Sequence, residues 1–166
     1  MPSSSDAVYW DASVFLSYVN GETERLTMID TLLDESRNGD FTIVTSTLSI
    51  TEVAFAEMEK TQQALDPDVE RAIDALFSDR EVVTLIEFHE VIARGARRLM
   101  RRALTSGRSL KPADAIHLAT AVQHGARVVH TYDDRMMGYT DLTELVIEVP
   151  TTTSPRLLDL PPEARE

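Results

Sequence analysis

The sequence predicts a three-layer α/β protein, in which helices cover both faces of a mainly parallel sheet of four to five strands. Short runs rich in β-branched and aromatic residues alternate with longer stretches in which apolar residues recur at helical spacing. Strands that alternate with helices pair in parallel, because each connecting helix crosses one face of the sheet. The 166 residues, 43% of them hydrophobic, suffice for one domain with a substantial core. We expect this domain at residues 1–150 and a turn-rich, flexible tail at residues 151–166.

The first strand is expected at residues 7–10, and a helix begins near Ala12. The segment from Val8 to Leu16 is apolar almost throughout, with Asp11 in its middle. An isolated carboxylate buried in such a run is costly, so Asp11 should lie at the end of the strand with a partner. Ligands of open α/β sheets bind outside the carboxyl ends of the strands. Asp11 is therefore the first candidate site residue.

The remaining elements continue the alternation. Further strands are expected at residues 41–45, 82–86, 127–131 and 145–149. Helices are expected at residues 22–38, after Thr47, from Pro67, at residues 88–104, and from Pro112 to Gly125. The helix after Thr47 should bury Ile50, Val53, Ala54 and Met58, and the helix at 88–104 should bury Val91, Ile92, Ala96, Leu99 and Ala103.

Composition argues against several classes of protein. No stretch is apolar for long enough to span a membrane, and the first residues lack the basic and apolar parts of a signal peptide, so we expect a cytoplasmic protein. The absence of cysteine excludes disulfides, thiolate zinc sites and a thiol nucleophile. The net charge of −12 argues against a general nucleic-acid coat protein, because phosphate contacts require cations.

The segment from residue 94 to residue 111 departs from this acidic average. It contains seven basic residues and no acid: Arg94, Arg97, Arg98, Arg101, Arg102, Arg108 and Lys111. A basic face on a helix is commonly only solvated. A basic patch on a protein this acidic also suits an RNA backbone. The candidate RNA-binding residues are therefore Arg94, Arg97, Arg98, Arg101, Arg108 and Lys111.

Four carboxylates fall at junctions between elements. Asp11 and Asp133 follow strands, and Glu52 and Asp114 lie early in helices. Each has a structural explanation by itself. Asp11 can cap a helix, Glu52 can complete a capping box with Ser49, Asp114 can interact with a helix dipole, and Asp133-Asp134 can form a turn.

Together the four acids favour a metal site. The ends of parallel strands and the beginnings of the helices that follow them both lie at the carboxyl edge of the sheet. Four carboxylates at this edge repel one another unless a cation neutralises them. Carboxylate oxygens without His or Cys ligands suit Mg²⁺ or Mn²⁺. The chemistry that such a site supports best is phosphoryl transfer.

These motifs resemble PIN-domain ribonucleases, and most closely the VapC toxins of bacterial toxin–antitoxin pairs. The resemblance rests on Asp11-x-Ser13 within residues 8–16, Glu52-Val53, the segment from Asp114 to Ala119, and Thr131-Tyr132-Asp133. It covers residues 8–149. No single motif is specific, whereas their common order, type and spacing are.

The resemblance implies a three-layer fold and metal-dependent endoribonuclease activity on tRNA, rRNA or mRNA, with Mg²⁺ or Mn²⁺ as cofactor. It also implies a cognate antitoxin and toxin homodimers. Carried over by position, the catalytic and metal-binding acids are Asp11, Glu52, Asp114 and Asp133, and the supporting hydroxyls are Ser13 and Thr131. The neighbouring Asp134 competes for the fourth position, and Asp133 is preferred because it keeps the Thr-x-Asp spacing.

Other hypotheses stay open from the residues alone. His117, three residues after Asp114, is interpreted as a packing or supporting residue, although a metal-free nuclease would use histidines. Similar acids occur in DNA or flap nucleases and in phosphatases. A PIN-like module that has lost catalysis could bind a basic peptide instead, and a protein with capped helices would bind no metal.

Overall fold

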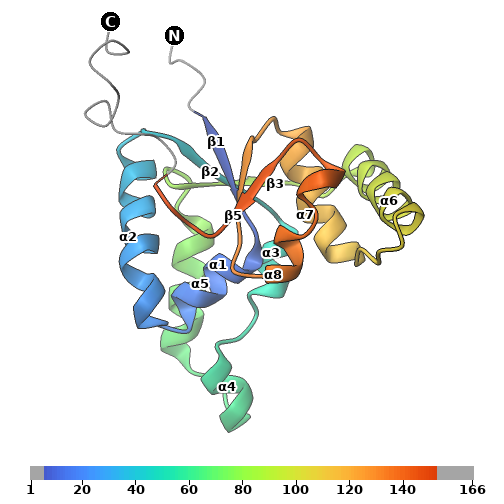
Figure 1. Ribbon diagram of the computed structural model, residues 1–166. Helices are drawn as coiled ribbons and strands as arrows, with labels where there is room; N and C mark the ends of the chain where they lie inside the picture. Colours follow the sequence, from blue (N-terminus) through green and yellow to red (C-terminus); the bar gives the residue numbers. More distant parts are fainter. Residues whose placement is uncertain (1–5, 153–166) are drawn as a thin grey trace, which may run out of the picture.

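The computed structural model describes residues 6–152, and its sheet is parallel throughout (Figure 1). The five strands follow the order β3-β2-β1-β4-β5. Their bounds are β1 Ala7–Trp10, β2 Thr42–Ser46, β3 Val83–Ile86, β4 Val128–His130 and β5 Val146–Glu148. The predicted α/β class and the parallel sheet are thus confirmed. Because β1 is central, the residue that follows it, Asp11, lies between the ends of β2 and β4.

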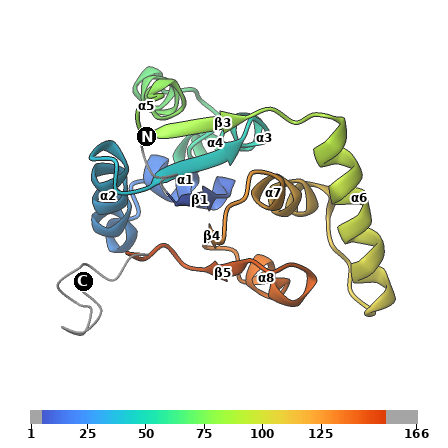
Figure 2. The ribbon, with the colours of Figure 1, turned by 90° about the horizontal axis from the view of Figure 1, so that it is seen from above.

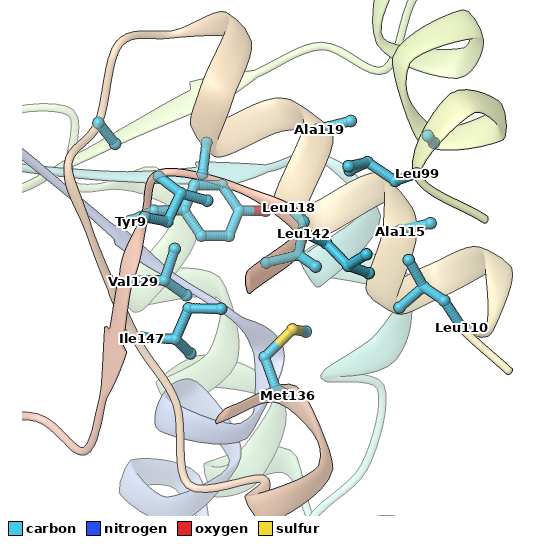
Figure 3. Close-up of a cluster of buried hydrophobic side chains, with 14 of the residues drawn as sticks. Tyr9, Leu99, Leu110, Ala115, Leu118, Ala119, Val129, Met136, Leu142 and Ile147 are labelled. Atoms are coloured by element: carbon cyan, nitrogen blue, oxygen red, sulfur yellow. The ribbon is translucent and has the colours of Figure 1, made fainter. Parts of the chain in front are cut away.

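Helices cover both faces of the sheet. One layer contains α1 (Ala12–Val19), α2 (Thr23–Arg37) and α5 (Pro67–Ser78), and the other contains α6 (Glu90–Thr105) and α7 (Pro112–Gln123). Figure 2 shows α6 and α7 on the opposite side of the sheet from α1 and α2. Alternate residues of β1 serve the two layers. Val8 and Trp10 pack towards α1 and α2, whereas Tyr9 packs with Leu118 and Val129 beneath α7 (Figure 3).

The segment after β2 differs from the prediction of one helix. It forms two short helices, α3 (Leu48–Glu52) and α4 (Glu57–Gln62). The backbone leaves the helical conformation at Val53, and the Glu59 carboxylate then accepts the Ala56 N–H at 3.0 Å and the Asp66 N–H at 2.8 Å. The bond to Ala56 starts α4 as a separate helix, because it satisfies an amide at the beginning of the helix, and the bond to Asp66 ties α4 to the segment before α5.

Two predictions of buried residues were therefore partly wrong. Of the four apolar residues expected to pack after Thr47, only Val53 is buried, whereas Ile50, Ala54 and Met58 are exposed. In α6 the stripe of Ile92, Ala96, Leu99 and Ala103 is buried as predicted, but Val91 is 51% exposed. The next residue, Ile92, is buried, so Val91 lies on a side of the first turn that does not face the core.

Two further short elements were not predicted: α8 (Asp134–Met137) and the 3₁₀ helix η1 (Thr140–Leu142). Both lie between β4 and β5 and contribute Met136 and Leu142 to the core (Figure 3). Of the predicted flexible tail, only Thr151 and Thr152 lie within the described residues. Within residues 6–152, no helix is both long and apolar enough to cross a membrane.

Candidate active site

The carboxyl edge of the sheet holds the predicted acids. Asp11 follows the central β1 and caps α1, and Asp133 follows the neighbouring β4 and caps α8. Glu52 is the last residue of α3, which follows β2, and Asp114 lies in the first turn of α7. For Asp11 and Asp133, the capping explanation and a place at this edge are both correct, since a carboxylate can bond a helix amide and still face a ligand.

Asp11 is only 4% exposed and is held by two hydroxyls. Its Oδ1 accepts bonds from the Ser13 N–H at 3.0 Å and from Ser13 Oγ at 2.5 Å. Its Oδ2 accepts a bond from Thr131 Oγ1 at 2.5 Å. Burial nevertheless raises the pKa of Asp11, although these bonds act in the opposite direction. The site therefore keeps a carboxylate in an environment that disfavours its charge.

The two hydroxyls are themselves fixed in direction. Ser13 Oγ accepts the Tyr132 N–H at 2.8 Å, and Thr131 Oγ1 accepts the Asp133 N–H at 2.9 Å. Each hydroxyl has its hydrogen aimed at Asp11 because a backbone amide occupies its acceptor side. The residues predicted as supporting hydroxyls thus contact the predicted acid, and they tie the end of β1 to the segment after β4.

Asp114 is partly buried beside the other acids. Burial raises its pKa, and the negative charge of Asp133 adds to this effect, with a smaller contribution from Glu52. Asp114 and Asp133 therefore lie close enough to repel each other. Asp134, the competing residue, is exposed at the start of α8.

Glu52 is bound by a histidine rather than by its own helix. Its Oε2 lies 2.5 Å from His117 Nε2, and His117 Nδ1 lies 2.6 Å from the Tyr9 hydroxyl. Tyr9 also accepts the Ser46 N–H at 3.1 Å, and burial raises its pKa, so its hydroxyl stays protonated and can donate a hydrogen bond to Nδ1. In the tautomer that accepts this bond, His117 donates from Nε2 to Glu52. The capping box expected for Glu52 is thus replaced by this contact.

Asp133 has a cationic partner that the sequence did not indicate. Arg135 lies two residues further on, and its Nη2 is 3.0 Å from Asp133 Oδ2. This guanidinium lowers the pKa of Asp133. A spacing of two residues gives no helical signal, so only the tertiary fold shows the pair.

The donor chemistry fits a hard divalent ion, since it consists of carboxylate and hydroxyl oxygens. Within the described residues, however, no group of three His, Asp or Glu side chains is arranged to hold an ion. Two of the acids are turned towards His117 and Arg135 instead. Ion binding would therefore draw these carboxylates together.

The predicted basic cluster is divided in space. Arg94 pairs with Glu90 at 2.6 Å, and Arg108 forms two bonds to Asp141 at 2.7 and 2.9 Å, so acids outside the cluster neutralise part of it. Arg102 lines a cavity of about 740 Å³ with residues that include Arg127, which precedes β4 at the amino edge. Lys111 lies at the start of α7 and lowers the pKa of Asp133, so it lies near the acids.

Comparison with known proteins gives one family. The PIN-domain family model matches residues 8–141. None of the curated proteins matches the sequence significantly.

Solved structures of toxin–antitoxin systems have the same fold. VapBC2 from Rickettsia felis, bound to a DNA fragment from its promoter, has a TM-score of 0.65 at 12% identity, over 86% of this chain and 98% of that chain. A toxin–antitoxin complex from Klebsiella pneumoniae has a TM-score of 0.58 at 18% identity, over 87% and 98%. VapC20 from Mycobacterium tuberculosis, a toxin that cleaves the sarcin-ricin loop, has a TM-score of 0.57 at 15% identity, over 84% and 98%.

Proposed function

The chain belongs to the PIN-domain family, and on this premise we propose that it is a metal-dependent endoribonuclease and the toxin of a toxin–antitoxin pair. The observation that carries the proposal is the buried Asp11 carboxylate, held by Ser13 and Thr131 at the edge where the other three acids lie. A charge buried at this cost is retained where function requires it.

Asp11, Glu52, Asp114 and Asp133 would hold Mg²⁺ or Mn²⁺. When bound, the ion lowers the pKa of water and offsets negative charge on the scissile phosphate. The Ser13 and Thr131 hydroxyls keep Asp11 in one orientation, and His117 does the same for Glu52. One of these carboxylates would also accept the proton that the attacking water loses. Cleavage would leave a 5′-phosphate and a 3′-hydroxyl.

The substrate and partner are proposed from the structural neighbours. A structured RNA such as tRNA or rRNA, or an mRNA, would be the substrate, because one neighbour cleaves the sarcin-ricin loop. An antitoxin would be the partner, because another neighbour is a toxin–antitoxin complex. A homodimer of the toxin and a cytoplasmic location accompany this proposal.

Cleavage of labelled RNA and DNA with Mg²⁺, Mn²⁺ or EDTA tests the proposal. We expect metal-dependent RNA cleavage, reduced on the order of a hundredfold or more in Asp11→Asn and Asp114→Asn, since changes even to groups that support metal ligands cost 10–100-fold. Asp66→Asn is the matched control, because Asp66 caps α5 on the surface. Cleavage of DNA alone would favour a flap-type nuclease. Metal binding without cleavage of either would favour an inactive binding module.

A further inference from the structure

Arg135 covers Asp133 at the opening of the candidate active site. Its Nη2 lies 3.0 Å from Asp133 Oδ2, and its Nε lies 3.3 Å from Oδ1. The Arg135 side chain is 61% exposed, whereas that of Asp133 is 27% exposed. The guanidinium thus lies on the solvent side of the carboxylate. Its charge also acts on Asp114, whose pKa it lowers.

The fold does not depend on this guanidinium. Asp133 caps α8 by accepting the backbone N–H of Arg135 at 2.9 Å, and any residue at position 135 except proline supplies that amide. An ion pair that is exposed to this degree contributes little to stability. The side chain of Arg135 therefore needs another explanation.

Electrostatics supplies one. Without a bound ion, Asp133 and Asp114 repel each other, and Arg135 is a positive charge that reduces the repulsion. A divalent ion on the same carboxylates would repel the guanidinium and compete with it for the Asp133 oxygens. Since Arg135 is mostly exposed, its side chain can swing away from Asp133 without unpacking the core.

Arg135 lines a groove beside Asp133, in which its guanidinium can turn away from that carboxylate. This groove, of about 570 Å³, extends from Ser13 and Asp133 along α1, and it is lined also by Arg25, Tyr132 and Arg135. The Arg25 guanidinium lies 4.0 Å above the centre of the Tyr132 ring, and Arg25 pairs with Glu22 at 2.8 Å. The Tyr132 amide is bonded to Ser13 Oγ, which also bonds Asp11. The groove is thus continuous with the acids. Glu22 and Asp134 line it as well, and Arg135, once it leaves Asp133, is the cation that suits a phosphate there.

We propose that Arg135 is an exchangeable counter-ion. In the ion-free protein it neutralises Asp133. When a divalent ion binds Asp133, the Arg135 guanidinium is displaced and binds a phosphate of the RNA strand in the groove along α1. This inference rests on the nuclease function proposed above. It makes metal binding a condition for full RNA binding on this side of the site. A guanidinium suits both partners, because its fork of N–H groups matches carboxylate and phosphate equally.

Metal titration of Arg135→Gln tests the first half of the proposal. Titration calorimetry with Mg²⁺ and with Ca²⁺ alone should show tighter binding than in the wild type, by up to about fivefold, since the ion no longer has to break an exposed ion pair worth about 0–1 kcal/mol. The control is Arg37→Gln, which removes an arginine that pairs with Asp34 and Asp79 at the end of α2. Unchanged or weaker metal affinity in Arg135→Gln would overturn the counter-ion role.

RNA binding tests the second half and should change in the opposite direction. The probe is a short fluorescent single-stranded RNA, measured by anisotropy with saturating Ca²⁺ in place of Mg²⁺ and checked by gel to be intact. Arg135→Gln should bind more weakly than the wild type, with the slope of log affinity against log salt smaller by about 0.7. In EDTA the difference should shrink, because Arg135 is then held by Asp133. Equal loss in EDTA and in Ca²⁺ would overturn the exchange.

The two proposals fail in distinguishable ways. If the wild type cleaves RNA with Mg²⁺ but Arg135→Gln leaves metal affinity unchanged, only the exchange is wrong. If the wild type binds metal and Arg135→Gln tightens that binding, but RNA is neither bound nor cleaved, the counter-ion half holds and the nuclease function fails. If the wild type binds no divalent ion with or without RNA, both are wrong.

Discussion

Replacing Asp11 by asparagine should make the ion-free protein more stable while abolishing metal binding. The carboxylate is 4% exposed, and burial raises its pKa, so the folded protein favours the neutral form of this side chain. Asparagine has the same shape and caps helices as well as aspartate does. Its Oδ1 can keep both bonds from Ser13, whereas the bond from the Thr131 hydroxyl to Oδ2 is lost, because the amide NH₂ at that place donates and does not accept.

The size of the effect follows from two opposing contributions. Removing a buried charge recovers an effective desolvation penalty of several kcal/mol. Weakening the bonds from Ser13 and losing the bond from Thr131, which are charge-assisted in the wild type, costs about 1.5–3 kcal/mol for each bond that is lost or much weakened. We expect a net gain of about 1–2 kcal/mol, which raises the Tm by about 2–8 °C for a domain of this size.

Thermal unfolding in EDTA and in Mg²⁺ measures this effect. In Mg²⁺ the wild type should gain stability by mass action and the variant should not, so the order of the two Tm values is expected to reverse at high Mg²⁺. Asp66→Asn, at an exposed cap on α5, should change the Tm little under either condition. A variant less stable than the wild type in EDTA would refute the reasoning, since Asp11 would then be a net stabilising cap.

The difference in stability between Asp11→Asn and the wild type should also depend on pH. Because folding raises the pKa of Asp11, the folded state binds this proton more readily than the unfolded state. The wild type therefore gains stability from Asp11 as the pH falls through the folded pKa, and loses it as the pH rises. The advantage of Asp11→Asn in EDTA should be full above the folded pKa of Asp11 and shrink as the pH falls through it. An advantage that grows on acidification would contradict the assigned shift.

Three further changes test the packing and the remaining basic residues. Tyr9→Phe should destabilise the fold by about 2–4 kcal/mol in urea unfolding, because the Ser46 N–H and the acceptor nitrogen of His117 each lose a buried partner. A loss of stability below about 0.5 kcal/mol would mean that these groups find other partners. Gly95→Ala should stabilise α6 by about 0.5–1 kcal/mol, since the added methyl meets Ala119 at an ordinary 3.5 Å, and a lower urea midpoint would show that the helices cannot adjust. If the exposed face of α6 binds RNA, Arg97→Gln/Arg101→Gln should reduce the salt slope of RNA affinity by about 1.4, and an unchanged slope would remove this face from the RNA-binding surface.

Much of the fold was predictable because it depends on local patterns. The β-branched runs and the helical spacing of apolar residues are set within a few turns of chain, and they predicted each strand and most helices. The failure after β2 comes from side-chain hydrogen bonding, since the Glu59 carboxylate bonds the Ala56 amide and α4 begins there as a separate helix. Hydrophobic spacing contains no signal for such a bond.

The same division applies to the candidate site. Chain direction and the alternation of strands and helices were enough to place Asp11, Glu52, Asp114 and Asp133 at one edge of the sheet, because the carboxyl ends of parallel strands all lie there. The resemblance to the PIN family also placed Ser13 and Thr131 at the site as supporting hydroxyls, and the structure adds that both bond Asp11.

Only the tertiary structure decided which partner each acid has in the ion-free protein. Glu52 meets His117, 65 residues away, and Asp133 meets Arg135 rather than a residue of the basic cluster. Arg108, expected to bind RNA, is held by Asp141. Sequence determines the edge on which a residue emerges, through strand direction and helix phase. The direction of its side chain is decided by the charges and hydrogen-bonding groups near it in the folded protein. These lie two residues away for Asp133 and 65 residues away for Glu52.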